Sequence, residues 1–386
     1  MLVTATRIHN GKQWLPEGTV IEVADNGIIA GIYDGPGRED NVHRYEGIIC
    51  PGFVNAHCHL ELSHMKGKVP EGTGLVPFLK QVALTRNNYT EEQKATARHR
   101  AFRDMSDNGI VAVGDIANTA DTLDLRAQDK IHFHSFVEAI GFTEHPQQQF
   151  EYAASVYNSF AEQILAARQL RQSIIPHAPY SVSQPLFNLI DKFDEHALLS
   201  IHNQESRAED EYYLVKKGPV GDLLQTVGID DTFFLPSGKS SLQTYLQWLS
   251  PGHPMMFVHN TYTTRADIEV AQTLLKNIYW CLCPNANMYI ESTLPDITML
   301  MQECNTICIG TDSLSSNHQL SVLAELQTIK RHYTAVEWED LLRWGTFNGA
   351  LALQMDNIVG SIEIGKEPGL LLISDLSSDK AITVLY

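Results

Sequence analysis

The sequence predicts an α/β protein with a central (β/α)8 barrel and a small β-sandwich that both chain ends build together. Three observations support this fold class. Short apolar runs recur through the middle of the chain, helical patterns separate them, and the two ends carry only β-like segments. Buried parallel strands that alternate with helices are typical of such barrels. We expect residues 1–50 and 358–386 to form the sandwich and residues 51–357 to form the barrel.

Both ends of the chain show short β-like runs that are interrupted by turn residues. The runs are Leu2–Thr6, Thr19–Val23, Gly369–Ser374 and Ala381–Leu385. Asn26-Gly27 and the Gly-Pro-Gly sequence at residues 35–37 are typical of tight turns between neighbouring strands. We therefore expect a small antiparallel β module.

The middle of the chain contains eight apolar runs, most of which end in a polar side chain. They are Phe53–His57, Ile110–Asp115, Ile131–Glu138, Ile174–His177, Leu198–His202, Met255–His259, Ile278–Cys283 and Ile307–Asp312. The segments between them are mostly helical in pattern, for example Glu91–Met105, Gln147–Gln172 and Ala266–Lys276. In a barrel the side chains that follow each strand carry the chemistry.

Two connections between these runs are longer than a barrel requires. They span Leu60–Gly109 and Asn203–Pro254. Long structured insertions at the carboxyl ends of barrel strands commonly shape a pocket, and we expect that role here. Packed helical excursions without a role at the pocket are the alternative.

Composition narrows the class of partner. The chain has 386 residues and a formal charge of −18, so it offers no basic field for a nucleic acid or an anionic membrane. It contains no apolar run near the roughly 20 residues of a membrane span. Its six cysteines form no framework typical of secreted proteins. We expect a small-molecule substrate, a cytoplasmic location and, by default, a homodimer.

Histidine and aspartate side chains at three of the strand ends form a candidate metal site. His57 and His59 are two residues apart, so on a strand both point to one face. His202 ends the fifth run and Asp312 the eighth, and the first and eighth strands of a closed barrel are neighbours. Each histidine alone could be a hydrogen-bonded core residue. Together, three imidazoles and a carboxylate can hold a divalent ion and leave a position for water.

The same strand ends supply candidate catalytic groups. A bound Zn²⁺ lowers the pKa of its water from about 16 to about 7. Glu205 lies three residues after His202 and is our candidate general acid and base, while His259 would orient the hydroxide. His177 ends the fourth run and suits a substrate contact. No lysine stands there to form a carbamate between two metals, so we expect one divalent ion, zinc with iron as the alternative.

Several longer motifs share these residues. They are Pro51–His59 (PGFVNAHCH), His177–Ser181 (HAPYS), His202–Glu205 (HNQE), Val258-His259, Cys283–Asn287 (CPNAN), Gly310–Asn317 (GTDSLSSN), Thr346–Ala350 and Gly360–Lys366. In this order they resemble the amidohydrolase superfamily over nearly the whole chain. The chain is most similar to its branch of chlorohydrolases and aminohydrolases, which includes guanine, cytosine and S-adenosylhomocysteine deaminases. The run His57–Ser63 resembles aminodeoxyfutalosine deaminases.

The resemblance implies a hydrolytic deaminase of an amino-substituted heterocycle, either a nucleobase or a nucleoside of the adenosine, guanine or aminodeoxyfutalosine type. It implies that a metal hydroxide attacks the ring carbon while Glu205 carries the proton and His259 and Asp312 stabilise the hydroxide. His177, Glu61, Ser63 and Asn287 are candidate substrate contacts.

Two other functions fit the same residues. A dechlorinating or cyclic-amide hydrolase would use the same hydroxide and carboxylate, so the motifs do not separate it from a deaminase. A metal-binding protein without catalysis would have no chemical need for Glu205, His259 and Asp312 together, which argues against that class.

Overall fold

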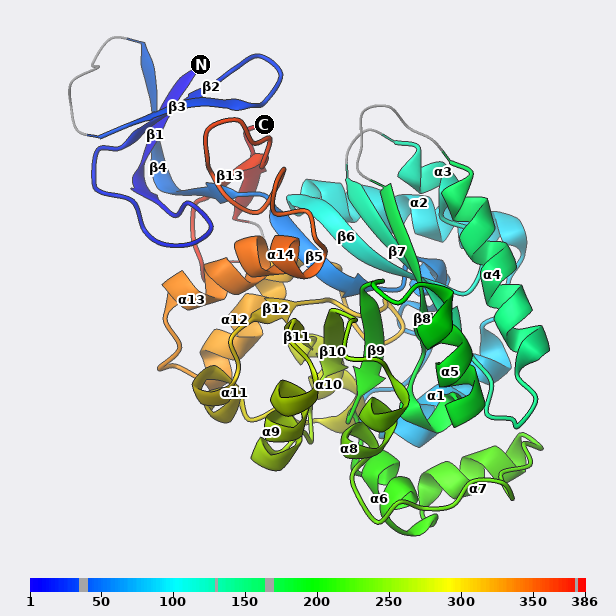
Figure 1. The fold of residues 1–386 in the computed structure, drawn as a ribbon. Helices are drawn as coiled ribbons and strands as arrows, with labels where there is room; N and C mark the ends of the chain where they lie inside the picture. Colours follow the sequence, from blue (N-terminus) through cyan, green and yellow to red (C-terminus); the bar gives the residue numbers. More distant parts are fainter. Residues whose placement is uncertain (35–40, 129–130, 164–169, 379–380) are drawn as a thin grey trace.

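Two four-stranded parallel sheets form the centre of the protein. The computed structural model describes residues 1–34, 41–128, 131–163, 170–378 and 381–386 (Figure 1). The strand orders are β5-β6-β7-β8 and β12-β11-β10-β9. The strands are β5 (Phe53–Cys58), β6 (Ile110–Ala117), β7 (His132–Ala139), β8 (Leu170–Pro176), β9 (Leu199–Asn203), β10 (Met255–His259), β11 (Ile278–Leu282) and β12 (Ile307–Ile309). All eight predicted runs are thereby confirmed as strands.

Backbone hydrogen bonds join the two sheets at both of their edges. The amide of His202 on β9 donates to the carbonyl of His177, which follows β8, over 3.0 Å. At the other edge the amide of Thr311, after β12, donates to the carbonyl of His57 on β5 over 3.0 Å. Side chains from the two ends of the sequence are therefore brought together at the carboxyl ends of the strands.

Helices connect these strands and cover the sheets. They are α1 (Leu75–Thr85), α2 (Glu91–Asp107), α3 (Leu123–Arg126), α4 (Gln147–Ala161), α5 (Gln184–Phe193), α6 (Arg207–Val215), α7 (Pro219–Thr226), α8 (Ser241–Tyr245), α9 (Arg265–Leu274), α10 (Pro284–Glu291), α11 (Ile297–Glu303), α12 (Val322–His332), α13 (Trp338–Arg343) and α14 (Gly349–Ala352). Short helical turns lie at η1 (Leu60–Met65), η2 (Pro179–Ser181), η3 (Leu246–Trp248) and η4 (Trp344–Asn348). None of the helices in the described part of the chain is both long and apolar enough to cross a membrane.

Local chemistry explains where the predicted helices begin. Thr90 and Thr264 cap α2 and α9 through capping boxes, in which the cap side chain and the third helical side chain satisfy each other's backbone amides. The second predicted helix, Gln147–Gln172, is too long. It ends as α4 at Ala161, and Leu170 begins β8 because it pairs with Phe133 on β7. Residues 164–169 lie outside the described part of the chain.

Both chain ends meet in one small sheet at one side of the larger α/β part (Figure 1). Its order is β14-β13-β4-β1-β2-β3. The strands are β1 (Leu2–Ile8), β2 (Val20–Val23), β3 (Ile29–Tyr33), β4 (Val42–Pro51), β13 (Leu370–Ile373) and β14 (Ile382–Val384).

The strands of the predicted β-sandwich are hydrogen-bonded into one continuous sheet, because β4 pairs with β1 on one side and with β13 on the other. The two chain ends therefore join edge to edge in a single sheet. That sheet is mixed rather than antiparallel, since β1 and β4 run parallel. Asn26-Gly27 forms the expected turn between β2 and β3, with Gly27 at a φ of 83° that favours glycine. The turn predicted at residues 35–37 lies outside the described residues.

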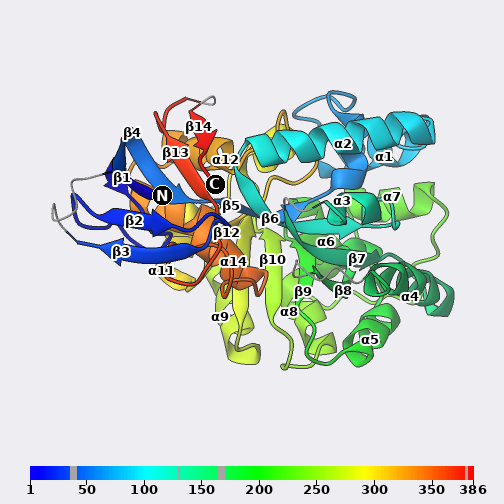
Figure 2. The ribbon, with the colours of Figure 1, turned by 90° about the horizontal axis from the view of Figure 1, so that it is seen from above.

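The two long insertions meet beside the carboxyl ends of the central strands. The first supplies α1 and α2, and the second supplies α6, α7 and α8. Helices α1 and α7 contact each other, and both views place them on the far side of the central strands from the small sheet (Figure 2). The insertions are therefore positioned to shape a cavity above the strand ends.

Candidate metal centre

Three imidazole nitrogens converge at the carboxyl ends of β5 and β9. The Nε2 atom of His59 lies 3.2 Å from Nε2 of His57 and 3.2 Å from Nε2 of His202. Asp312, which follows β12, places Oδ1 3.4 Å from Nε2 of His59 and 3.6 Å from Nε2 of His57. All four side chains are buried. The residues predicted as metal ligands thus lie together, although β5 and β12 are distant in the sequence.

The spacing of these atoms fits a divalent ion. Tetrahedral Zn²⁺ with ligand bonds of about 2.0–2.1 Å holds its ligand atoms about 3.3 Å from one another. The observed separations of 3.2–3.6 Å match that distance. Protons alone cannot satisfy three Nε2 atoms that face one another, whereas one shared cation can. The residues present therefore fit a zinc-type ion.

A neighbouring contact fixes the orientation of His202. Its Nδ1 atom lies 2.8 Å from the carbonyl oxygen of His177. A carbonyl only accepts hydrogen bonds, so the proton of His202 lies on Nδ1 and the lone pair on Nε2 is free for a ligand. Burial lowers the pKa of His59 and of His202 well below the usual value, which keeps both imidazoles neutral and able to bind metal.

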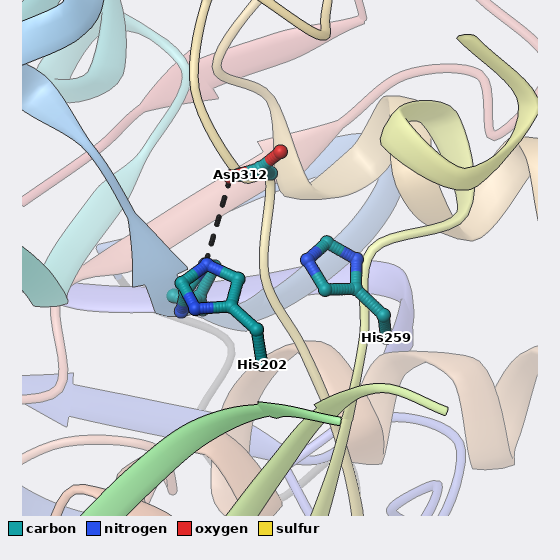
Figure 3. Close-up of side chains that lie close together, drawn as sticks. His202, His259 and Asp312 are labelled. Carbon is teal, nitrogen blue, oxygen red and sulfur yellow. Dashed lines mark ion pairs between the residues drawn. The ribbon is translucent and has the colours of Figure 1, made fainter. Parts of the chain in front are cut away.

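His259 ends β10 and borders the same space (Figure 3). His57, His202, His259 and Asp312 have ligand atoms that all lie within 4.8 Å of one another. Nδ1 of His259 lies 3.1 Å from the amide oxygen of Asn287, while its buried Nε2 has no hydrogen-bond partner. We assign the proton to Nδ1 because that oxygen accepts hydrogen bonds. The sequence suggested only a catalytic role for His259, yet the geometry also makes it a potential ligand.

Asp312 is held in an unusual backbone conformation. Its φ is 56°, in the left-handed region that non-glycine residues adopt at a cost. Oδ2 accepts a hydrogen bond from the hydroxyl of Ser316. Burial by itself would raise the pKa of Asp312, but the adjacent imidazoles of His57, His59 and His259 bring it well below the usual value. The carboxylate is therefore ionised beside the imidazoles.

Glu205 lies on the open side of the cluster, between β9 and α6. Its Oε1 atom is 3.7 Å from Nε2 of His259, and the side chain is buried. Burial raises the pKa of Glu205 well above the usual value, and the charge of Asp312 adds to the rise. A carboxyl group in this setting can hold a proton at neutral pH and release it when a cation binds nearby.

A cavity of about 1100 Å³ opens beside these groups. His59, His177, His202, Glu205 and His259 line its floor, together with Asp312. Its walls are largely apolar and come from α1, α7 and the segments after β7 and β8. The apolar lining residues include Leu75, Phe78, Leu79, Val82, Phe142, Tyr180, Leu224 and Ile229. Both insertions therefore contribute to the cavity, as expected from the sequence.

Of the four predicted substrate contacts, His177 borders the cavity. Glu61, Ser63 and Asn287 are not among the described residues that line it. The hydroxyl of Ser63 donates to the carbonyl of Leu60 over 2.7 Å. Glu61 accepts from the backbone amide of Asn118 over 2.9 Å, and Asn287 contacts His259. These three side chains lie behind the residues that face the cavity.

Sequence reasoning missed Glu138 as a site residue, although this carboxylate ends the third apolar run. It lines the cavity and is buried. Its Oε2 atom accepts from the side-chain amide of Asn118 over 2.8 Å, and its Oε1 atom lies 3.6 Å from Nδ1 of His202 without a hydrogen-bond partner. Burial raises the pKa of Glu138 to about 8, and a divalent ion held by the neighbouring His202 would lower it again and favour the carboxylate. The position of this carboxylate at a strand end was the available signal.

Comparisons with known proteins agree with this architecture. A model of the amidohydrolase family matches residues 48–385. An adenosine deaminase from Helicobacter pylori is 25% identical over 328 residues, which cover 84% of this chain and 78% of that protein.

Two solved structures share the fold. The Helicobacter pylori aminofutalosine deaminase in complex with methylthio-coformycin has a TM-score of 0.82 at 21% identity and covers 97% of this chain and 92% of its own. The atrazine chlorohydrolase from Arthrobacter aurescens complexed with zinc has a TM-score of 0.72 at 16% identity, with coverages of 97% and 87%.

Proposed function

The chain belongs to the amidohydrolase family of hydrolases that act on carbon–nitrogen bonds, and from this premise we propose that it is a metal-dependent deaminase of an adenosine-type nucleoside or a related amino-substituted heterocycle. The observation that carries the proposal is the convergence of His57, His59, His202 and Asp312, with Glu205 on the open side of the cluster. The deaminases among its relatives supply the substrate class.

In this proposal one divalent ion is held by His57, His59, His202 and Asp312, with His259 beside it. We propose zinc, which the related chlorohydrolase binds, with iron as the alternative. When bound, such an ion activates a water molecule as a nucleophile at neutral pH. The neutral imidazoles and the ionised carboxylate are the protonation states that a divalent cation requires of its ligands.

Glu205 moves the protons of the reaction. Its carboxyl group faces the space next to His259 and takes a proton from the attacking water. It delivers that proton to the ring nitrogen beside the reacting carbon. After the tetrahedral intermediate forms, the same carboxylate takes the remaining proton from its new hydroxyl group and passes it to the amine, so the carbon–nitrogen bond breaks, ammonia leaves and a carbonyl forms. The raised pKa of Glu205 supports this role, because a buried carboxyl group holds a proton more readily than an exposed one and can pass it on.

Other side chains orient the ring and the catalytic groups. His177 borders the cavity beside His202 and is proposed to contact the substrate. Asn287 is proposed to act on the substrate through His259, whose imidazole it holds. Glu61 and Ser63 lie behind the cavity, so we propose that they support its wall instead of touching the substrate directly.

We also infer the larger organisation of the chain. The hydrogen bonds at both sheet edges support one closed (β/α)8 barrel over residues 51–357, with residues 1–50 and 358–386 in the small β domain. The free state of the six cysteines agrees with a cytoplasmic location. The proposed partner is a small heterocyclic molecule, and a homodimer stays a prediction.

Ammonia release tests the proposed function. The zinc-loaded protein is assayed with guanine, adenosine, S-adenosylhomocysteine, cytosine and aminodeoxyfutalosine. Glu205→Gln serves as the blank, and the exposed Glu195→Gln serves as a matched control. We expect turnover of an adenosine-type member, a loss of about 10²–10⁴-fold in the blank, and unchanged metal content.

Two results would contradict the proposal. Near wild-type turnover in Glu205→Gln would remove the proposed proton carrier. Silence of the metal-loaded wild type across the panel would favour dechlorination or cyclic-amide hydrolysis, the chemistry that the similarity to the chlorohydrolase leaves as the second candidate.

A further inference from the structure

Among the described residues, Glu138 is the one buried carboxylate at the cavity that the proposed mechanism does not use. It lies near the end of β7, on the side of His202 that faces away from the three converging nitrogens. Its neighbour Asn118 donates to Oε2 over 2.8 Å and so fixes how the carboxyl group is turned. The carboxyl group is therefore held at the cavity wall by one oxygen only.

The second oxygen of Glu138 has no partner among the described residues. Oε1 is buried and makes no hydrogen bond, although the side chain lines the cavity. Buried polar atoms in native proteins are nearly always hydrogen-bonded, so an exception must have a physical reason. A ligand atom in the cavity would provide the missing partner.

Glu138 could instead orient His202 or bind a second metal, but both roles fit the distances less well than a substrate contact does. If Glu138 oriented His202, it would accept the imidazole N–H, but that N–H already points at the carbonyl of His177 at 2.8 Å, against 3.6 Å to Glu138. If Glu138, His177 and His202 held a second metal, His202 would need a lone pair on Nδ1, where its proton lies. The free oxygen is therefore left for the substrate.

The chemistry of an adenosine-type substrate limits what can meet this oxygen. Such a nucleoside carries hydrogen-bond donors only on its exocyclic amine and on its sugar hydroxyls. The amine is the leaving group, and in the proposed reaction it faces Glu205 and His259. A carboxylate that meets a nucleoside elsewhere therefore finds a hydroxyl, the contact that acidic residues commonly make with ribose.

We propose that Glu138 is a specificity-determining residue that accepts a hydrogen bond from a sugar hydroxyl of the substrate. This inference rests on the proposed function and deepens it, because it makes the substrate a nucleoside and not a free base. The cavity has room for a nucleoside, and beyond Glu138 its wall continues through Ile140, Phe142 and Thr143. Asn118 becomes the positioning residue that holds the carboxyl group for this contact.

Substrate discrimination tests the assignment. Adenosine, 2′-deoxyadenosine, 3′-deoxyadenosine and adenine are compared on the metal-loaded wild type, Glu138→Ala and Glu138→Gln, with the exposed Glu151→Gln as a matched control. The readouts are kcat/KM from ammonia release, Kd from calorimetry and bound metal per chain. Because calorimetry does not depend on turnover, it reports on Glu138 even if deamination itself is not the reaction.

We expect the wild type and the control to favour adenosine over at least one deoxy analogue by about 10²-fold or more, because a site built around a hydroxyl rejects analogues that lack it. In Glu138→Ala the preference falls to within about threefold and bound metal is unchanged. The isosteric Glu138→Gln keeps the shape of the site if the alanine variant does not fold. Because Asn118 donates at the position of Oε2, the amide oxygen of this variant takes that place and its nitrogen, which only donates, faces the substrate, so the preference falls there too.

Three results would overturn the assignment. The first is equal kcat/KM and Kd values for all four probes in the wild type. The second is an unchanged preference for adenosine over the deoxy analogues in Glu138→Ala and Glu138→Gln. The third is loss of bound metal from these variants. Selective binding of adenosine without ammonia release would support Glu138 and refute the deaminase. Absence of both binding and turnover for every nucleoside would refute both.

Discussion

Two buried polar clusters lie close together at the carboxyl ends of the central strands, and they differ in how their charges are satisfied. In the metal centre, His57, His59 and His202 face one another with nitrogen atoms that cannot all be partnered by protons. Near it, Glu325 on α12 accepts from Asn285 and Asn317 on both of its oxygens. The first cluster needs a cation to be satisfied, whereas the second is complete within the protein.

This difference distinguishes the metal centre, which needs a ligand, from the Glu325 cluster, which stabilises the fold around it. Buried polar groups cost free energy unless they are paired, so a completed network stabilises one arrangement of the chain. Asn317 joins the two clusters, because its amide donates to Glu325 over 2.7 Å and to the carbonyl of Thr311 over 2.8 Å. Thr311 precedes Asp312. The Glu325 cluster therefore holds the loop that presents Asp312 to the imidazoles.

Removal of a ligand should have the largest effect. Asp312→Asn deletes the negative charge of the metal centre, so we expect metal affinity to fall by more than about 100-fold, since even changes behind metal ligands cost about 10–100-fold. Turnover should fall by more than about 1000-fold, because the activated water is lost with the metal. Bound metal by elemental analysis and ammonia release provide the measurements.

Thermal unfolding adds a second readout of the same variant. Zinc at 100 times its Kd for the wild type should stabilise the wild type by about 2.7 kcal/mol, and it should stabilise Asp312→Asn by no more than about 0.4 kcal/mol. The exposed Asp25→Asn serves as the control and should behave as the wild type. Full metal content in Asp312→Asn would contradict the assignment of Asp312 as a ligand.

Removal of the Glu325 carboxylate should change the free energy of unfolding more than the rate of the reaction. Glu325→Ala removes the acceptor that the half-buried Asn285 and the buried Asn317 share, and we expect the free energy of unfolding to fall by about 3 kcal/mol. Urea unfolding of the metal-free protein measures this loss as a shift of the midpoint at constant slope.

Metal binding by Glu325→Ala tests whether the two clusters have different roles. Zinc should still bind to Glu325→Ala in a one-to-one ratio, and Glu325→Gln should be less destabilised because it keeps one acceptor. An alanine variant that keeps its stability but loses its metal would reverse the roles assigned to the two clusters.

A lower pH should reduce the stability of the metal-free protein through the buried imidazoles of the metal centre. Burial lowers the pKa of His57, His59, His202 and His259, so these groups stay neutral in the fold while the unfolded chain protonates them below about pH 6.5. Their contribution is therefore present above that pH and is lost as the pH falls through the folded pKa values. The expected slope is at most about 1.4 kcal/mol per pH unit for each imidazole.

Unfolding of the metal-free protein at pH 5.5 and pH 7.5 measures this slope. His59→Gln should lose less stability in acid than the wild type, whereas His196→Gln, which changes an exposed imidazole, should match the wild type. Equal acid sensitivity of all three proteins would show that the buried imidazoles do not set the pH dependence.

Local patterns were sufficient to predict the strands and the polar side chains that converge at their carboxyl ends. A buried strand shows itself as an apolar run, and the side chains that follow it in a barrel converge, so His57, His59, His202 and Asp312 were identifiable from the sequence. The pattern between Gln147 and Gln172 was misleading at its end, because Leu170–Gln172 form β8 by pairing with β7, a contact that helical periodicity does not reveal.

By itself, the sequence determined which segments become strands and which residues stand at their ends, since these properties depend on neighbours along the chain. Tertiary structure alone decided that the chain ends join in a single sheet, that Asn287 holds His259, and that one oxygen of Glu138 is left without a partner among the described residues. Each of these facts depends on contacts between segments far apart in the sequence. Such contacts form only when the segments pack together, so the local pattern of residues does not reveal them.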